Sequence, residues 1–211
     1  MTEPSPTNVG VIPYGGSVAS QRSIEARQSL LRVGLYAQVR PYLSNLTPSS
    51  VLSISGADGL VAMLPRGDFD VETTSFPEIR MEDLPYANGS FDLVLSDQVL
   101  EHTEQPFVAM REAARVLKPG GLMAHTTCFL NPVHDDPGDY WRFTPGALVR
   151  LCSDETVVGA GGWGNRAAVV MVLYGQRRLL SRPLFRRLAT RLVARNDSRC
   201  PVVTWVIATK P

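Results

Sequence analysis

Residues 134–144 concentrate side chains that bind or activate substrates. They read HDDPGDYWRFT, with one histidine, three acids, three aromatics and an arginine close together. Earlier in the chain, Glu101 and His102 form an adjacent carboxylate–imidazole pair. Imidazoles and carboxylates act as general bases, and together they can also hold a divalent cation. Either chemistry requires the two segments to meet in space.

Three interpretations of these residues remain open. His134 could be a general base, with neutral imidazole as the working form and Asp135 or Asp136 orienting it. Glu101, His102 and His134 could instead be the catalytic and metal-ligating set for an ion such as Mg²⁺, which would acidify a bound hydroxyl. In a purely structural interpretation, Glu101 lies near a helix start, and a further helix starts at 144–145.

The surrounding sequence alternates strand and helix patterns. We expect helices over 20–43 and 107–117 and from 145 onward. The expected strands are 51–55, 68–71, 91–96, 122–129 and 202–209. Residues 118–121 (KPGG) should end a helix, and 160–165 (AGGWGN) indicate a glycine-rich turn that could place Trp163 at an acceptor pocket. This alternation favours an α/β domain with a mostly parallel sheet, whose ligands bind at the carboxyl ends of the strands.

Length and composition indicate a single domain of ordinary size. The chain has 211 residues and a net charge of +1, so nothing in it attracts nucleic acid as a partner. No apolar run is long enough for a membrane span, and the first residues do not form a signal peptide. Three scattered cysteines indicate reduced thiols, so we expect a cytoplasmic protein.

Two segments are expected to lie outside the regular core. Residues 1–17 predict a flexible arm or lid that carries Tyr14 towards the substrate, before a single domain over 18–211. Within that domain, about 166–198 predict an arginine-rich helical insertion. Its basic face could be simply solvated, could contact an anionic or glycan substrate, or could form a homodimer contact.

One stretch carries a family resemblance. Residues 82–121 include EDLPYANGSFDLVLSDQVLEH and end in RVLKPGG. They resemble the class I S-adenosylmethionine-dependent methyltransferases, and the likeness extends over roughly 50–150. It implies a seven-stranded Rossmann-like sheet flanked by helices, with S-adenosylmethionine as the cofactor.

The resemblance also implies a cofactor site. It places Ser55, Gly56 and Asp58 at the methionine end, Asp70 or Glu72 at the ribose, Met81 and Glu82 at the adenine, and Ser96 and Asp97 beside the methyl donor. The chain departs from the family pattern, because Ser53 replaces an acid, Ser55 and Ala57 replace glycines, and Arg80 stands where an aspartate is common. A non-catalytic binding module on this fold is therefore an alternative.

The acceptor is inferred from two further resemblances. The 134–144 segment resembles glycan-tailoring methyltransferases, which implies substrate contacts from Asp139, Tyr140, Trp141 and Arg142. That reading predicts methyl transfer to a sugar or oligosaccharide hydroxyl, with 1-O-methylation of a methylated mannoside in methylmannose polysaccharide synthesis as a specific candidate. The Glu101-His102 pair and His134 are similar to the metal sites of small-RNA 2′-O-methyltransferases and quinone-biosynthesis O-methyltransferases. A small natural product or a quinone is thus the alternative acceptor.

Overall fold

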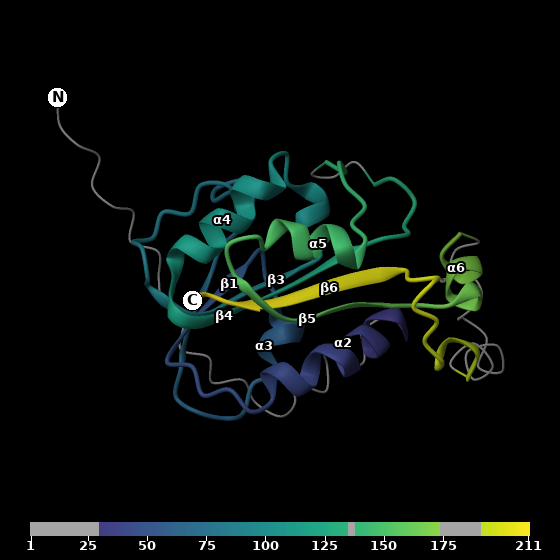
Figure 1. Cartoon of the computed structure of the whole chain (residues 1–211), viewed down its shortest axis with the longest axis horizontal. Coiled ribbons are helices and arrows are strands. Elements are labelled where there is room, and N and C mark those ends of the chain that lie inside the picture. Colours follow the sequence, from purple (N-terminus) through teal and green to yellow (C-terminus); the bar gives the residue numbers. More distant parts are fainter. Residues whose placement is uncertain (1–29, 135–137, 174–190) are drawn as a thin grey trace.

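The computed structural model describes residues 30–134, 138–173 and 191–211, and the side chains from Arg32 onward. In it, a central sheet lies between two layers of helices (Figure 1). The elements are α2 (Leu30–Leu43), β1 (Ser50–Ile54), α3 (Asp58–Val61), β2 (Asp70–Thr73), β3 (Phe91–Asp97), the 3₁₀ turn η1 (Leu100–His102), α4 (Pro106–Val116), β4 (Leu117–Cys128), α5 (Pro145–Leu151), β5 (Thr156–Trp163), α6 (Arg166–Leu173) and β6 (Val203–Thr209).

The sheet has the order β2-β1-β3-β4-β6-β5. The first four strands are parallel, and β6 runs antiparallel to both of its neighbours. The predicted mostly parallel α/β sheet is therefore confirmed, but it has six strands within the described residues rather than seven. Because β2 and β3 lie on opposite sides of β1, the strand order reverses there, and the carboxyl ends of these strands open a crevice.

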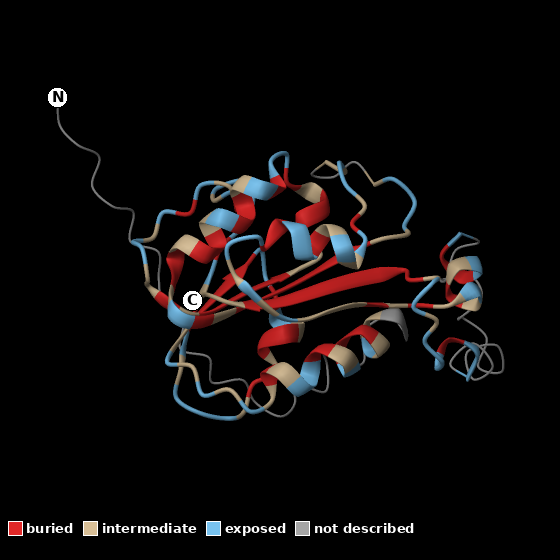
Figure 2. Cartoon of the chain, viewed as in Figure 1, coloured by how far each residue is buried: buried red, intermediate tan, exposed pale blue. Residues whose placement is uncertain are grey.

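Side chains alternate between two apolar cores. On one face of the sheet, Leu93 and Leu95 of β3 pack towards α2 and α3, whereas on the other face Val94 packs towards α4 and α5. The inner strands β1, β3 and β6 are buried on both faces (Figure 2), which explains their nearly continuous apolar sequences, whereas the edge strands β2 and β5 are largely exposed or half-buried. Helix α5 begins as predicted, because Thr144 Oγ1 accepts a hydrogen bond from the amide of Ala147.

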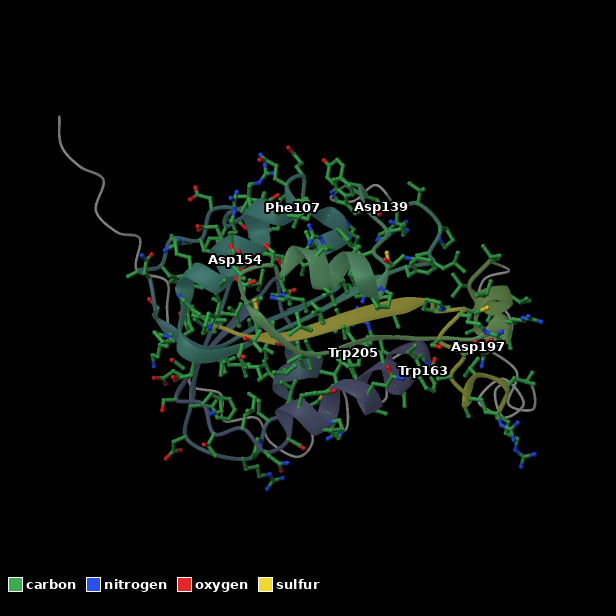
Figure 3. The ribbon with its side chains drawn as sticks, in the orientation of Figure 1. Phe107, Asp139, Asp154, Trp163, Asp197 and Trp205 are labelled. Atoms are coloured by element: carbon green, nitrogen blue, oxygen red, sulfur yellow. The ribbon has the colours of Figure 1, made fainter. Side chains whose placement is uncertain are left out.

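The predicted glycine-rich turn is wrong, because residues 156–163 form the edge strand β5. Its glycines make room for aromatic rings: a Cβ on Gly159 would meet the Tyr42 ring, and one on Gly161 would meet Trp205. The ring of Trp163 packs against Gly34 of α2, and Trp163 and Trp205 are labelled in Figure 3. Trp163 is therefore part of this packing and does not line the pocket described below.

Some predicted features fall outside the described residues. They are the 1–17 arm with Tyr14, and the stretch of the arginine-rich insertion between α6 and residue 191. Among the helices that the structure does describe, none has both the length and the apolar character needed to cross a bilayer.

The contact between α2 and β5 gives a first prediction. A Cβ on Gly34 would lie 1.9 Å from the Trp163 ring, so Gly34→Ala should displace the indole and destabilise the protein by about 1–3 kcal/mol. Urea denaturation measures this change. Gly67→Ala is the control, since a Cβ there meets nothing within 4 Å. Equal stability of the two variants would contradict the packing described here.

Candidate functional site

A cavity of about 540 Å³ opens at the carboxyl ends of β1, β2 and β3. Ser55 and Gly56 line it after β1, and residues 73–76 and 79–82 line it at and beyond the end of β2. Its remaining wall follows β3 and comprises Gln98, Val99, His102 and Thr103. This is the position and the size range in which α/β sheets bind small molecules.

The turn after β1 is built for close approach of a ligand. Ser55 and Gly56 both have left-handed backbone angles, with φ values of 53° and 81°. The Ser53 hydroxyl closes the turn by accepting a hydrogen bond from the Ala57 amide at 2.8 Å, and Thr74 Oγ1 accepts one from the Ser55 amide at 3.1 Å. Ser53 thus stabilises the turn from the position where the proteins that the sequence resembles more often have an acid.

The cavity contains four of the nine predicted cofactor residues: Ser55, Gly56, Met81 and Glu82. Glu82 is held from both sides, since its carboxylate accepts a hydrogen bond from the Glu104 amide at 2.9 Å and lies 3.6 Å from the Arg80 guanidinium. Asp58 lies at the start of α3 and is exposed outside the lining. The cavity lining that was not predicted includes Thr73, Thr74, Ser75, Phe76, Ile79, Arg80, Gln98, Val99 and Thr103.

The structure does not bring Asp70 and Glu72, predicted at the ribose, to the lining of this cavity. Asp70 begins β2 opposite Ser50, so it lies at the amino-terminal edge of the sheet. Glu72 accepts a hydrogen bond from the Tyr86 hydroxyl at 3.1 Å, and it does not line the cavity. Both acids miss the cavity because β2 starts and ends two residues later than the apolar pattern suggested, which brings hydroxyl residues rather than acids to the cavity.

Ser96 and Asp97 also lie outside the lining, one on each face of the sheet. Ser96 is buried beside His125, whose Nδ1 lies 2.7 Å from its hydroxyl. Burial lowers the pKa of His125 to about 3, so this pair is neutral. The Asp97 carboxylate accepts hydrogen bonds from Tyr36 and Thr126, and Arg32 lies 3.4 Å away. Both residues therefore support the strand end rather than the cavity wall.

Glu101, His102 and His134 do come together. One ligand atom from each lies within 4.8 Å of the others, and the two imidazole centroids are 4.9 Å apart. The predicted meeting of the two segments is thus confirmed as geometry. Backbone contacts hold them together, because the Tyr140 amide donates to the Glu101 carbonyl at 2.8 Å and Trp141 Nε1 donates to the Thr103 carbonyl at 2.9 Å.

The environment of this cluster suits a cation. The Glu101 residue is 1% exposed, and its carboxylate accepts a hydrogen bond from Thr127 Oγ1 at 2.7 Å. No salt bridge to Glu101 is found among the described residues, and the cation whose charge acts on it is Arg142, which is paired with Asp139. His102 Nδ1 bonds to the Gly138 carbonyl, while His134 Nδ1 lies 3.1 Å from the Asp139 carboxylate. The contacts found among the described residues use Nδ1 of each ring and leave Nε2 for another partner, as in metal-ligating histidines.

Asp139 and Arg142 hold the 131–142 loop. The Asp139 side chain is 0% exposed, and it accepts a hydrogen bond from the His134 amide at 3.0 Å and another from Arg142. The adjacent guanidinium holds the pKa of Asp139 well below its usual range. These contacts favour an orienting role over the predicted substrate contact. Asp139 is the carboxylate beside His134 among the described residues, whereas Asp135 and Asp136, predicted to orient that ring, lie outside them. Tyr140 and Trp141 keep exposed rings.

Sequence comparison finds a family model over part of the chain. Residues 33–125 match the family described as a methyltransferase domain. A ubiquinone biosynthesis O-methyltransferase from Cereibacter sphaeroides is 34% identical over 83 residues, which are 37% of this chain and 34% of that protein. A malonyl-[acyl-carrier protein] O-methyltransferase from Hahella chejuensis is 45% identical over 47 residues, 22% of this chain and 17% of that protein. The chain thus spans about a third or less of the length of these relatives.

Solved structures share the fold at low sequence identity. A phosphoethanolamine N-methyltransferase from Haemonchus contortus, in complex with S-adenosylhomocysteine, has a TM-score of 0.55 and 13% identity over 85% of this chain and 52% of that one. The [4+2]-cyclase SpnF has a TM-score of 0.54 and 15% identity over 96% of this chain and 87% of that one. Because the second protein is titled a cyclase, the fold alone does not specify the reaction.

Proposed function

We propose that this chain, which carries a methyltransferase domain match over residues 33–125 in a class I fold, transfers a methyl group from S-adenosylmethionine to a hydroxyl oxygen. The observation that carries the proposal is the position of the Glu101–His102–His134 cluster. His102 belongs both to this cluster and to the wall of the 540 Å³ cavity, so a cofactor site and an oxygen-activating site share a boundary.

The cavity offers complementary chemistry to the cofactor. Thr73, Thr74 and Ser75 present hydroxyls for the ribose, and Phe76, Ile79 and Met81 present apolar surface for a flat base. Glu82 can accept from an exocyclic amine. A bound cofactor supplies an electrophilic methyl group. The remaining task for the protein is to align the acceptor oxygen with that methyl and to remove its proton.

A divalent cation such as Mg²⁺ fits the cluster. A buried carboxylate without an ion-pair partner among the described residues, and two imidazoles with their Nδ1 atoms already bonded, form a suitable set of ligands. Glu101, His102 and His134 would hold the ion, which when bound lowers the pKa of a coordinated hydroxyl. In a mechanism without the ion, His134 takes the proton, and Asp139 orients its ring.

The proposed acceptor is a sugar or oligosaccharide hydroxyl, including position 1 of a methylated mannoside. The exposed rings of Tyr140 and Trp141 support it, since aromatic surfaces can cover the apolar face of a sugar. A phenolic or quinol acceptor is the second candidate. It is favoured by the ubiquinone-biosynthesis relatives and by the apolar, exposed Val133 next to His134.

A product screen tests the reaction and separates the acceptors. The protein is incubated with methyl-labelled cofactor, Mg²⁺ and two acceptor panels, methylated mannosides and catechols. Label in a mannoside supports the sugar proposal, and label in a catechol supports the second candidate. Cofactor binding without transfer to any hydroxyl in either panel would favour a non-catalytic binding module.

Cofactor binding gives a further prediction. Gly56→Ala should weaken S-adenosylhomocysteine binding at least about tenfold, because the new methyl group would strain a left-handed residue and enter the cavity wall. Isothermal titration calorimetry measures the change. Gly89→Ala is a matched control, since Gly89 has a similar φ of 69° but does not line the cavity. If both variants bind as wild type does, the cofactor lies elsewhere.

A further inference from the structure

Gln98 lines the cavity and stands between its two functional parts. It follows Asp97 at the end of β3 and precedes η1, which carries Glu101 and His102. Its backbone is left-handed, with φ at 61°, and in the described part of the chain only Ser55 shares this feature among non-glycine residues. Such a conformation costs about 1–2 kcal/mol for a residue with a side chain, so its presence at a site points to a use.

The hydrogen bonds around Gln98 determine which way its amide faces. Thr126 Oγ1 lies 2.5 Å from the Asp97 carboxylate, which can only accept, so the single hydroxyl hydrogen of Thr126 is donated there. Thr126 must therefore accept at its second contact, 3.2 Å from the Gln98 amide nitrogen. Tyr36 also donates a hydrogen bond to Asp97 at 2.5 Å, which agrees with Asp97 acting as the acceptor of the Thr126 hydroxyl hydrogen.

Because the Gln98 amide nitrogen donates to Thr126, the side-chain carbonyl oxygen of Gln98 is held in one orientation, in which it can accept a hydrogen bond from a ligand. This oxygen has no hydrogen-bond partner among the described residues. It is not fully buried, so a ligand in the cavity can reach it. The neighbouring Asp97 carboxylate is paired with Arg32 at 3.4 Å, so its charge is already balanced. The Gln98 oxygen itself therefore carries the argument, because a partly negative amide oxygen aimed at a ligand favours a positively charged group.

From this juxtaposition we infer that Gln98 recognises the positive centre of the methyl donor and so distinguishes the charged donor from its neutral product. The inference rests on the proposed function, because it assumes the cofactor occupies the cavity. Gln98 is a specificity-determining residue in this account, since an amide oxygen contacts the reacting group but takes no proton from it. Preference for the charged form also helps the product to leave.

A pair of ligands isolates the charge. S-adenosylhomocysteine is neutral at sulfur, whereas sinefungin carries an amine in place of the methylsulfonium group. Calorimetry should show that wild type binds sinefungin more tightly. Gln98→Met, which keeps the size but loses the oxygen, should weaken sinefungin about tenfold or more and change S-adenosylhomocysteine less than about threefold. Thr126→Val, which frees the amide to turn, should lower the same preference.

Gln98→Gly separates this role from a structural one. It relieves the left-handed backbone, so its melting temperature should equal or exceed that of wild type, yet it should lose the sinefungin preference as Gln98→Met does. Equal weakening of both ligands, or an unchanged preference, would overturn the inference while leaving the proposed function in place. Failure of wild type to bind either ligand would instead overturn both.

Discussion

Replacing Glu101 by Gln is expected to weaken Mn²⁺ binding at least tenfold and to lower methyl transfer by about 10²–10⁴-fold. Glu101 supplies the one carboxylate of the cluster with His102 and His134. Calorimetry with Mn²⁺ measures the first effect without any acceptor, and the acceptor found by the product screen serves for the second. His102→Ala and His134→Ala should be comparably damaging, and a chelator should abolish activity that Mg²⁺ restores.

The alternative, His134 as a metal-free base, gives a different pattern. Only His134→Ala would then lose about 10²–10⁴-fold, and a chelator would have no effect. Glu104→Gln is the matched control, since Glu104 lies on the same segment but outside the cluster and is exposed. Near-wild-type turnover of His134→Ala would contradict both mechanisms and leave the loop with a structural role alone.

Asp139→Asn is expected to destabilise the protein by about 2–3 kcal/mol at pH 7, because it leaves Arg142 and the His134 amide without their charged acceptor. Turnover should fall as well, since Asp139 also fixes the His134 ring. Urea denaturation measures the stability. Asp154→Asn is the control, because Asp154 is exposed and has only a weak side-chain hydrogen bond of 3.4 Å from Ser153, without a cationic partner among the described residues.

The same variant predicts a pH dependence. The pKa of Asp139 is lower in the folded protein than its ordinary value near 3.9. Its contribution to stability is therefore fully present above that value and is lost as the pH falls below it. The stability difference between wild type and Asp139→Asn should be constant from pH 7 to about 5 and should shrink towards pH 2.5. A difference that stays constant over the whole range would show that Asp139 is not held by charge.

Local signals made much of the fold predictable. Helix α5 begins with its Thr144 cap, and β3 is buried on both faces, as the continuous apolar pattern of residues 91–96 indicated. Strand β5 was missed because Gly159, Gly161 and Gly162 read as a turn. Only the rings of Tyr42 and Trp205, distant in sequence, show that the glycines make room for packing. Long-range contacts of this kind override local propensity.

The candidate site was likewise predictable only in part from the sequence. Glu101, His102 and His134 were predictable as a cluster, since each follows a strand of one parallel sheet. The positions of Asp70 and Glu72 were not, because a two-residue change in the bounds of β2 moves them away from the carboxyl edge. The sequence did not indicate that Gln98 would face the cofactor. Its role depends on the left-handed backbone and on a chain of hydrogen bonds through Thr126 and Asp97.

The central claim is that the 540 Å³ cavity holds S-adenosylmethionine beside an oxygen-activating cluster. A crystal structure of the protein soaked with S-adenosylhomocysteine tests this claim most directly. We expect the ribose to lie against Thr73–Ser75, the base against Phe76 and Met81, and the sulfur on the side of Gln98 and His102. Crystals soaked to saturation that show the cavity filled only by water, or the ligand bound away from these residues, would contradict it.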